Sequence, residues 1–423
     1  MRVTLSYGRQ GLSLELPETP GFQGILRPQE TEPLDQPEVA VAEALQKPIA
    51  APALAQLAGQ RHNACIVISD ITRPVPNSVI LPPILREIEN AGIRREAITI
   101  LIATGIHRPN LGNELEELVG PEIAASYRII NHYSKNREDM VPVYEIAPGV
   151  KAEVNRHYLN AELKILTGFI EPHMWAGFSG GRKSILPGIS SLETLEYMHG
   201  PEMIADPGTV YGKLAGNPFH EAGLKVMEKA GADFIVNVTL DTSKQITRVF
   251  AGDPVQAHLE GCRFLAPHCM RTLDEPLDFI VTSNSGAPLD CNLYQTVKGI
   301  TGAAPVVREG GEIIIASQCS EGAGSPEYVK ILEMIDTPEN FLDRLMKREF
   351  FIADQWCAQE TYQVVVKHPV WLYSDGLSPE EISRYHLKPI TSVEDAVSEL
   401  LHKYGPQARW AVVPDGPLLI LTL

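Results

Sequence analysis

Three short apolar runs, each followed at once by polar residues, constrain the fold of this chain more than any other feature of its sequence. The runs are residues 64–68 (ACIVI), 98–103 (ITILIA) and 163–166 (LKIL), and helical patterns such as residues 79–91 lie between some of them. Short continuous apolar runs separated by helices are typical of parallel strands that are buried on both faces. The sequence therefore predicts an α/β fold with a largely parallel sheet.

A second α/β series predicts a second domain. Residues 277–282 (LDFIVT) and 312–316 have the pattern of strands, with a helix between them. A chain of 423 residues is also too long for one ordinary core. We expect two α/β domains with largely parallel sheets and an interdomain cleft, covering residues 1–270 and 271–423. The tail ending in LLILTL predicts a strand that either domain could contain.

Several shorter patterns complete the expected secondary structure. They are an N-terminal hairpin with its turn at residues 8–11, a helix over 34–60, a hairpin over 233–250, a helix over 254–266, a link over 267–276 and a helix that begins at Ser325 and Pro326.

Composition excludes several classes of partner. Lys and Arg number 36 against 53 Asp and Glu, which gives a net charge of −17. Such an acidic chain disfavours nucleic acid and anionic membrane as partners. We find no apolar run long enough to cross a membrane and no signal peptide at the start. The six cysteines form no C-x-x-C pair, so we expect reduced thiols and a cytoplasmic location.

Each of the three apolar runs ends in a cluster of chemically useful side chains. Asp70 and Arg73 follow the first run, His107 follows the second, and Glu171 and His173 follow the third. The carboxyl ends of parallel strands meet at one edge of a sheet, where open α/β folds bind ligands. A single histidine after a strand is more often structural, but three coincident clusters predict a site.

A glycine-rich segment, residues 177–184 (GFSGGRKS), follows the third cluster. Its glycines would let backbone N–H groups approach a phosphate, with Arg182 and Lys183 adding positive charge. It is not a Walker A loop, which requires Gly directly before the Lys. A tight turn with a solvated basic pair is the alternative interpretation. The chain also lacks a G-x-G-x-x-G fingerprint after its first strand, so a standard dinucleotide site is not expected.

His199, in the segment YMHGP, is a candidate metal ligand. Neutral imidazole is the commonest metal ligand in proteins. The sequence has no cysteine cluster and no H-E-x-x-H motif, so a metal would need most of its ligands from elsewhere.

The segment NLYQTVKG places three further candidates on one helix face. Tyr294 and Gln295 lie four and three residues before Lys298, a spacing that puts the three side chains together. Lys298 could reach a carboxylate across the expected cleft, although a solvated helix lysine is the simpler interpretation.

Together these segments resemble the nickel-dependent lactate racemase family. The matching motifs lie in family order over most of the chain: SDITRP (69–74), TGIHRP (104–109), EPHMWAGFSGGRKS (171–184), MHGP (198–201) and NLYQTVKG (292–299). The resemblance implies a racemase that interconverts the enantiomers of a small 2-hydroxy acid, with lactate as the default substrate.

The resemblance also implies a cofactor. That family uses pyridinium-3-thioamide-5-thiocarboxylic acid mononucleotide, a tethered nucleotide whose two sulfur-containing arms and one ring carbon hold nickel as a pincer. Lys183 would form the tether and His199 would supply the remaining nickel ligand. The loop residues expected near the phosphate end are Ser179, Gly180, Gly181 and Arg182. Separate biosynthetic enzymes must build this cofactor, so they are the expected partners for loading, and protein made without them would lack it.

The remaining motif residues match the family's substrate site. His107 and His173 match two catalytic histidines, and the predicted substrate-binding residues are Arg73, Lys298, Tyr294, Gln295, Asp70 and Trp175. Removing a proton from Cα of a 2-hydroxy acid would create a carbanion beside a carboxylate, whereas removing hydride leaves a 2-keto acid. Return of hydride to the other face then requires two acid/base groups with pKa near neutrality, a property of histidine.

Three alternatives remain open from sequence. Bulky Met174 and Trp175 beside His173 leave aromatic, dicarboxylic or sugar 2-hydroxy acids as other substrates for the same machinery. A carrier that holds nickel or the cofactor without catalysis would retain Lys183 but lack a catalytic histidine. A phosphate-binding protein without enzymatic activity would use the glycine-rich loop alone. The paired histidines argue against both non-enzymes.

Overall fold

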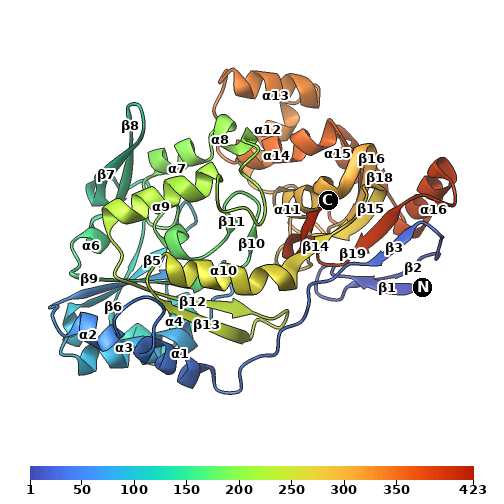
Figure 1. The fold of residues 1–423 in the computed structure, drawn as a ribbon. Helices are drawn as coiled ribbons and strands as arrows, with labels where there is room; N and C mark the ends of the chain where they lie inside the picture. The colour runs from blue at the N-terminus through green and yellow to red at the C-terminus, as the bar shows by residue number, and fades with distance from the viewer. The chain divides into compact units, whose positions relative to one another are not determined.

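The computed structural model describes residues 1–423, and the chain divides into two compact α/β units. One unit contains Glu30–His199 and Pro207–His268, and it is called the His107 unit below. The other contains Met1–Gln29, Gly200–Asp206 and Cys269–Leu423, and it is called the Lys298 unit. A six-stranded sheet lies at the centre of each (Figure 1). The predicted fold class, two α/β domains with largely parallel sheets, is confirmed.

The sheet of the His107 unit has the order β13-β12-β9-β4-β5-β6. Every neighbouring pair is parallel except the hairpin of β12 and β13. The three predicted apolar runs are the adjacent strands β9, β4 and β5, so their carboxyl ends lie at one edge. The strands are β4 (Ala64–Ser69), β5 (Ile98–Ala103), β6 (Arg128–Asn131), β9 (Leu163–Phe169), β12 (Phe234–Leu240) and β13 (Ile246–Gly252).

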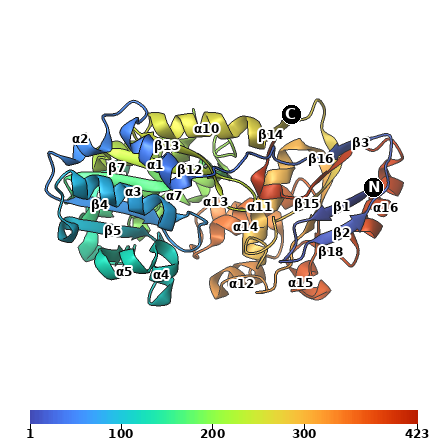
Figure 2. The ribbon, with the colours of Figure 1, turned by 90° about the horizontal axis from the view of Figure 1, so that it is seen from below.

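Helices cover both faces of this sheet, which explains why its central strands are mostly apolar. On one face lie α1 (Pro37–Gln46), α2 (Leu54–Ala58) and α3 (Asn77–Asn90), whose buried residues share a core with β4 and β5 (Figure 2). On the other face α10 (Gln256–Cys269) packs its Gly261 against Phe250 of β13. The predicted single helix over 34–60 is wrong, because Pro48 and Pro52 interrupt it.

Smaller elements of the His107 unit extend from this layered core. They are α4 (Asn113–Val119), α5 (Pro121–Ser126), β7 (Met140–Ala147), β8 (Val150–Asn155), α6 (Arg156–Leu159), β10 (Pro172–His173), β11 (Gly177–Phe178), α7 (Leu192–Met198) and α9 (Pro218–Ala230), with short 3₁₀ turns at η1 (Arg95–Ala97), η2 (Arg137–Asp139) and η3 (Gly181–Ser184). The predicted hairpin over 233–250 is confirmed as β12 and β13.

The sheet of the Lys298 unit is wholly parallel, with the order β18-β17-β16-β15-β19-β3. Its strands are β3 (Phe22–Ile25), β15 (Leu277–Ser283), β16 (Val307–Ala316), β17 (Val370–Tyr373), β18 (Lys388–Ile390) and β19 (Trp410–Val413). Around it lie β1 (Arg2–Leu5), β2 (Leu12–Glu15), α8 (Pro201–Ala205), β14 (Met270–Thr272), α11 (Leu293–Ala303), η4 (Ala304–Val306), α12 (Pro326–Glu333), α13 (Pro338–Met346), α14 (Gln355–Val365), α15 (Pro379–Arg384), α16 (Val393–Tyr404), η5 (Gly416–Leu418) and β20 (Ile420–Thr422). The predicted start of α12 is confirmed, because the Ser325 side chain caps it and Pro326 is its first residue.

Two segments of the predicted first domain lie in the Lys298 unit instead. Residues 1–29 belong there because β3 pairs with β19 and the β1–β2 hairpin packs on the apolar core of this sheet. Residues 200–206 belong there because α8 packs on α14, where Gln359 donates a hydrogen bond to the Pro201 carbonyl. The C-terminal tail forms β20, which pairs with β14, so the predicted link over 267–276 contains a helix end and a strand.

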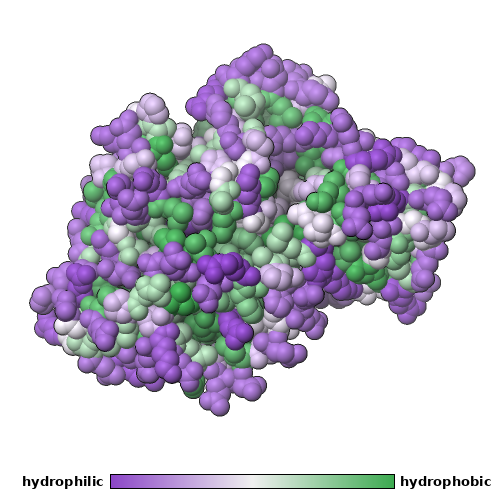
Figure 3. All heavy atoms as spheres, in the orientation of Figure 1, coloured by the Kyte–Doolittle hydropathy of each residue, from purple (hydrophilic) through white to green (hydrophobic).

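Hydrophilic side chains cover much of the face shown in Figure 3. None of the helices is both long and apolar enough to span a membrane.

Candidate functional site

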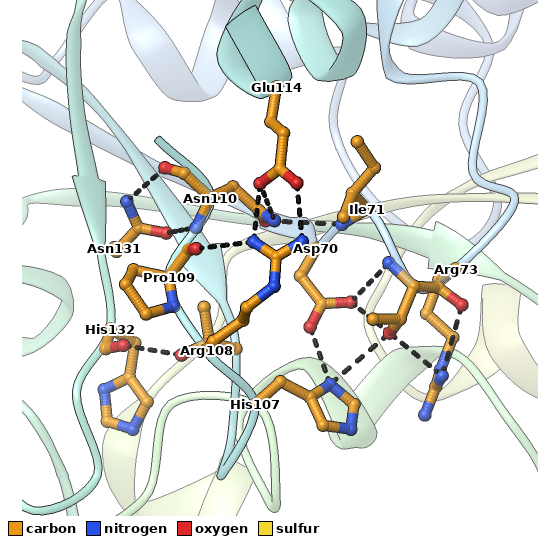
Figure 4. Close-up of polar contacts among 12 residues, drawn as sticks. Asp70, Ile71, Arg73, His107, Arg108, Pro109, Asn110, Glu114, Asn131 and His132 are labelled. Carbon is orange, nitrogen blue, oxygen red and sulfur yellow. Dashed lines mark hydrogen bonds and ion pairs between the residues drawn. The ribbon is translucent and has the colours of Figure 1, made fainter. Parts of the chain in front are cut away.

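The Asp70 carboxylate and the His107 ring form a hydrogen-bonded pair at the carboxyl edge of the sheet (Figure 4). Asp70 follows β4 and His107 lies in the loop after the neighbouring strand β5. Asp70 Oδ2 lies 2.7 Å from His107 Nδ1. Only 2% of the Asp70 side chain is exposed, against 40% of the His107 side chain. A buried acid therefore anchors an imidazole that is accessible from outside.

The charge state of Asp70 determines which ring nitrogen of His107 has the proton. Burial raises the pKa of Asp70, but hydrogen bonds from His107 and Thr72 and the charge of Arg73 outweigh burial and lower the pKa below its usual value. An ionised carboxylate only accepts hydrogen bonds, so His107 Nδ1 donates to it, and in the neutral ring Nε2 has the lone pair. An imidazole in this tautomer is ready to take a proton from a bound ligand.

Neighbouring side chains hold this pair in place. Thr72 Oγ1 donates to Asp70 Oδ1 at 2.6 Å, and Arg73 Nη1 donates to Thr72 Oγ1 at 3.1 Å. The Arg73 side chain is exposed beside the pair (Figure 4). The predicted cluster of Asp70, Arg73 and His107 is therefore brought together by the fold.

A pair of asparagines connects the loops that follow β4, β5 and β6. Asn110 Oδ1 accepts a hydrogen bond from the Ile71 N–H at 3.3 Å. Asn110 and Asn131 exchange two hydrogen bonds of 2.8 and 2.9 Å (Figure 4). Sequence reasoning missed these residues. The predicted pattern did not point to them, because Asn110 lies beyond the TGIHRP segment that follows the second run, and Asn131 ends β6, a strand that the sequence did not predict.

His173 lies in a tight hairpin formed by β10 and β11, and its ring is held by the turn itself. The backbone N–H groups of Trp175 and Ala176 both donate to His173 Nδ1, each at 3.2 Å. A nitrogen that accepts two N–H donors cannot bear a proton, so the neutral ring has its proton on Nε2. The tautomer of His173 is therefore the opposite of that of His107.

His199 lies against the aromatic side chains of this hairpin and of α9. The Trp175 ring is edge-on to it at 5.0 Å between centroids, and Phe219 lies at 5.6 Å. His199 Nδ1 donates to the Leu195 carbonyl at 2.8 Å, which leaves the lone pair on Nε2. Burial lowers the pKa of His199 to about 4, and the charge of Lys183 acts in the same direction. The ring is thus neutral at pH 7, the form that binds metals.

Lys183 lies in η3, and its loop is shaped by two glycines. Gly180 and Gly181 have φ values of 80° and 55°, in the left-handed region that favours glycine. A Cβ on Gly180 would lie 2.7 Å from Asn237 Oδ1, the atom that accepts a hydrogen bond from the Gly181 N–H. Sequence reasoning missed Asn237, although a polar residue inside the apolar strand FIVNVTL was a signal for it.

The position of Arg182 differs from the predicted contact with phosphate. Its side chain is buried, and Nη2 donates to the carbonyls of Ala176 and Phe178 at 2.7 and 3.0 Å. Nη1 lies 3.0 Å from His258 Nε2. Burial lowers the pKa of the guanidinium to about 10, still well above neutral pH. Arg182 therefore holds the hairpin that contains His173, because both of its Nη groups are directed at the protein.

Ser179 likewise holds the loop together. Its hydroxyl donates to the Phe169 carbonyl and accepts from the Glu171 N–H, both at 2.9 Å, and its own N–H donates to the Glu171 carbonyl. The Lys183 N–H donates to the Gly180 carbonyl. The N–H groups of Ser179, Gly181 and Lys183 are thus directed at partners within the protein.

The three candidates on α11 lie in the Lys298 unit. Tyr294 is packed inward: its hydroxyl accepts from Trp356 Nε1 at 3.0 Å and its ring is 5.3 Å from that of Tyr328. Burial raises the pKa of Tyr294 well above its usual value. Gln295 and Lys298 are half-buried, one turn apart on the same helix.

No group of three or more His, Cys, Asp and Glu side chains in the structure is arranged to hold a metal ion. The donor set does fit a metal whose other ligands come with a tethered group. His199 offers one neutral imidazole nitrogen, and the Lys183 ammonium lies near enough to lower its pKa. A lysine near a single neutral imidazole fits a metal cofactor that is attached through a side chain.

Comparison with known proteins adds a family to this geometry. Residues 7–212 match the family described as "Lactate racemase N-terminal domain", and residues 273–421 match "Lactate racemase C-terminal domain". A lactate racemase from Thermoanaerobacterium thermosaccharolyticum is 34% identical over 424 residues, 99% of each chain. One from Lactiplantibacillus plantarum is 37% identical over 379 residues, 89% of each chain.

Two solved structures resemble the chain. The lactate racemase apoprotein from Thermoanaerobacterium thermosaccharolyticum matches with a TM-score of 0.94 and 34% identity, covering 100% of both chains. A crystal structure of a protein from Thermotoga maritima matches with a TM-score of 0.68 and 20% identity, covering 93% of this chain and 99% of that one. The second likeness concerns the fold alone.

Proposed function

We propose that the chain, which belongs to the lactate racemase family, interconverts the enantiomers of a small 2-hydroxy acid. It is then an isomerase, with lactate as the default substrate. The single observation that supports catalysis most strongly is the pair of Asp70 and His107, a buried carboxylate at 2.7 Å from an accessible imidazole. A carrier of nickel or cofactor has no use for such a pair.

The proposed reaction begins with substrate positioned beside His107. Arg73 binds the carboxylate through its guanidinium, which forms paired hydrogen bonds with such groups. His107 Nε2 takes the hydroxyl proton as the C2 hydrogen leaves with its electron pair, so the substrate becomes a 2-keto acid. The nickel-pincer nucleotide, when bound, supplies a centre that accepts and returns hydride. When hydride returns to the opposite face of the keto acid, His173 donates a proton to the oxygen on that side.

Lys183 is the proposed attachment point and His199 the proposed nickel ligand. The half-buried position of Lys183 and its electrostatic influence on His199 support this assignment. His199 would bind through Nε2, because Nδ1 donates to the Leu195 carbonyl. Nickel dependence is a family property, and the pincer nucleotide in this chain is part of the proposal.

Substrate range is the finer part of the proposal. Trp175 is 8% exposed and packs against His199 and Phe219, so it supports a compact wall beside the proposed nickel ligand. That wall favours a small 2-substituent such as the methyl group of lactate. Lys298 and its neighbour Gln295 are proposed to bind substrate on the family resemblance, and Lys298→Ala should raise KM.

A racemisation assay across a panel of 2-hydroxy acids tests the function. The protein is produced together with the cofactor-building enzymes, and each pure enantiomer of lactate and of aromatic, dicarboxylic and sugar 2-hydroxy acids is supplied. We expect lactate to racemise fastest. Replacing His107 or His173 by Ala should lower the rate by roughly 100- to 10,000-fold. Loaded protein that racemises none of these acids, or a His107→Ala variant with wild-type rates, would contradict the proposal.

A further inference from the structure

The hairpin that holds His173 is itself fixed from outside by one fully buried asparagine, Asn217. Asn217 Nδ2 donates to the Trp175 carbonyl at 2.8 Å and to the Lys213 carbonyl at 3.0 Å. The Trp175 carbonyl belongs to the same peptide group as the Ala176 N–H, which donates to His173 Nδ1. Asn217 therefore fixes the plane of one of the two peptides whose N–H groups donate to His173 Nδ1.

The orientation of the Asn217 amide is determined by its surroundings. Its Oδ1 accepts the His220 N–H at 3.1 Å, which caps the N-terminus of α9. A flipped amide would direct its oxygen at two carbonyls and its NH₂ at an N–H donor, so the assigned orientation is the only one that satisfies all the partners.

A second buried group holds the next peptide of the same turn. Arg182 Nη2 donates to the Ala176 carbonyl at 2.7 Å. Its stem also packs on α9, because a Cβ on Gly223 would lie 2.8 Å from Arg182 Cγ. At the end of the turn, a Cβ on Gly177 would lie 2.1 Å from the Lys213 carbonyl oxygen, so the hairpin is docked closely on the segment before α9. Asn217 and Arg182 thus hold successive peptides of the turn against α9 and the segment that precedes it.

We infer that Asn217 is a positioning residue for His173, one that holds the Trp175–Ala176 peptide so that the neutral ring keeps its proton on Nε2. This inference rests on the proposed role of His173 as an acid/base group. His107 is held in the opposite tautomer by Asp70. In the neutral rings the two Nε2 atoms then differ: that of His107 has the lone pair, and that of His173 has the proton.

This arrangement has a kinetic consequence. His107 can accept a hydroxyl proton as it stands, whereas His173 must first move its ring proton or turn its ring before it can do so. The two enantiomers of a substrate have equal free energies, so kcat/KM must be equal in the two directions. The difference between the histidines therefore appears as unequal kcat and KM values that compensate each other.

The experiment is a long-range ¹H–¹⁵N correlation of the full-length chain labelled at its histidines, combined with kinetics of the loaded enzyme. The spectrum shows which nitrogen of each ring is protonated, and His173→Gln and His107→Gln identify the two signals. We expect His173 to be protonated on Nε2 and His107 on Nδ1. A wild-type spectrum with His173 protonated on Nδ1 would overturn the inference.

The decisive variant is Asn217→Ser. Serine caps a helix as well as asparagine does but cannot reach the Trp175 carbonyl. The variant therefore keeps the helix cap and loses only the hydrogen bonds that Asn217 Nδ2 donates. We expect the His173 signals to become those of mixed tautomers, the His107 signals to stay, and kcat/KM to fall on the order of 10- to 100-fold, as for a small misplacement of a catalytic group. A folded Asn217→Ser protein with the wild-type His173 pattern and wild-type turnover would refute the positioning role.

Two further variants complete the design. Asn217→Asp keeps the cap and the side-chain size while losing the amide donor, and it replaces the serine variant if that protein folds poorly. Asn155→Ser is the matched control, because Asn155 is also a buried N-cap, and its Nδ2 donates to His132 Nδ1 instead. It should alter the His132 signals alone. If the tautomers shift as expected while His173→Gln remains an active racemase, the proposed function of His173 fails and the positioning role of Asn217 survives.

Discussion

Replacing Asp70 by Asn should reverse the proton position on His107. Thr72 donates to Asp70 Oδ1 from both its N–H and its hydroxyl, at 3.1 and 2.6 Å. An asparagine must therefore place its oxygen at that position and its NH₂ group toward His107 Nδ1. Nδ1 then accepts a hydrogen bond, the ring proton moves to Nε2, and the lone pair that takes the substrate proton is lost.

The size of the effect follows from the geometry of the pair. A hydrogen bond to a charged group contributes about 1.5–3 kcal/mol, which corresponds to roughly 10- to 150-fold in rate. The same substitution in a Ser-His-Asp triad lowers kcat about 10⁴-fold through the wrong tautomer. We therefore expect kcat/KM of Asp70→Asn to fall between about 10- and 10⁴-fold.

The assay is racemisation by the loaded variant together with the histidine ¹⁵N spectrum. Glu114→Gln is the matched control, since Glu114, in the first turn of α4, pairs with Arg108 beside His107 but forms no hydrogen bond with His107 itself. Its activity should stay near that of the wild type. If Asp70→Asn keeps its activity within about threefold, or keeps the His107 proton on Nδ1, the reasoning is refuted.

Asp70 should also make stability depend on pH. Its pKa is lower in the folded protein than in the unfolded chain, so the ionised carboxylate stabilises the fold at pH values above its unfolded pKa. That contribution is lost as pH falls through the folded pKa. The free energy of unfolding of Asp70→Asn should therefore fall less as the pH is lowered than that of the wild type, and measurements of unfolding across the acidic range test this.

Three further predictions concern the glycine-rich loop and its neighbours. Lys183→Ala should abolish the mass adduct of protein co-produced with the cofactor-building enzymes, and an adduct that survives in this variant would remove Lys183 from its role. His199→Ala should lower the nickel content measured by elemental analysis, whereas unchanged occupancy and activity would show that another group binds the metal. Gly180→Ala should lower the free energy of unfolding by about 1–3 kcal/mol, because alanine is strained at positive φ and its Cβ would meet Asn237. Gly149→Ala has a similar φ with nothing within 4 Å, so it measures the strain alone, and an equal loss in both variants would exclude the steric contribution.

Local patterns in the sequence predicted the parts of the structure that depend on local burial. The strands β4, β5 and β9 were predictable because burial on both faces of the sheet requires mostly apolar residues along each of them. The meeting of Asp70 with His107 followed from the topology of parallel strands, which brings residues far apart in the chain to one edge.

Features that depend on distant pairing were not predictable in this way. The pairing of β3 with β19 joins the first thirty or so residues to the far end of the chain. The pattern of apolar residues in a segment can predict a strand, but it does not predict which other strand will pair with it. The inward orientation of Arg182 was missed for a similar reason. A basic residue in a glycine-rich loop suggests that the loop binds an anion. Only the fold shows that Arg182 Nη2 donates its hydrogen bonds to backbone carbonyls. Asn217 was missed because the sequence of a helix N-cap does not show whether the side-chain amide also donates a hydrogen bond to a distant hairpin.

The most direct test of the proposed chemistry is racemisation in D₂O. Loaded protein is given one enantiomer of lactate, and deuterium at C2 of the recovered acid is measured by NMR or mass spectrometry. If the C2 hydrogen moves as hydride and His107 and His173 handle only the hydroxyl proton, both enantiomers should keep protium at C2. Incorporation of solvent deuterium at C2 with each inversion would show that a proton is removed from carbon, and would contradict the roles proposed for the two histidines.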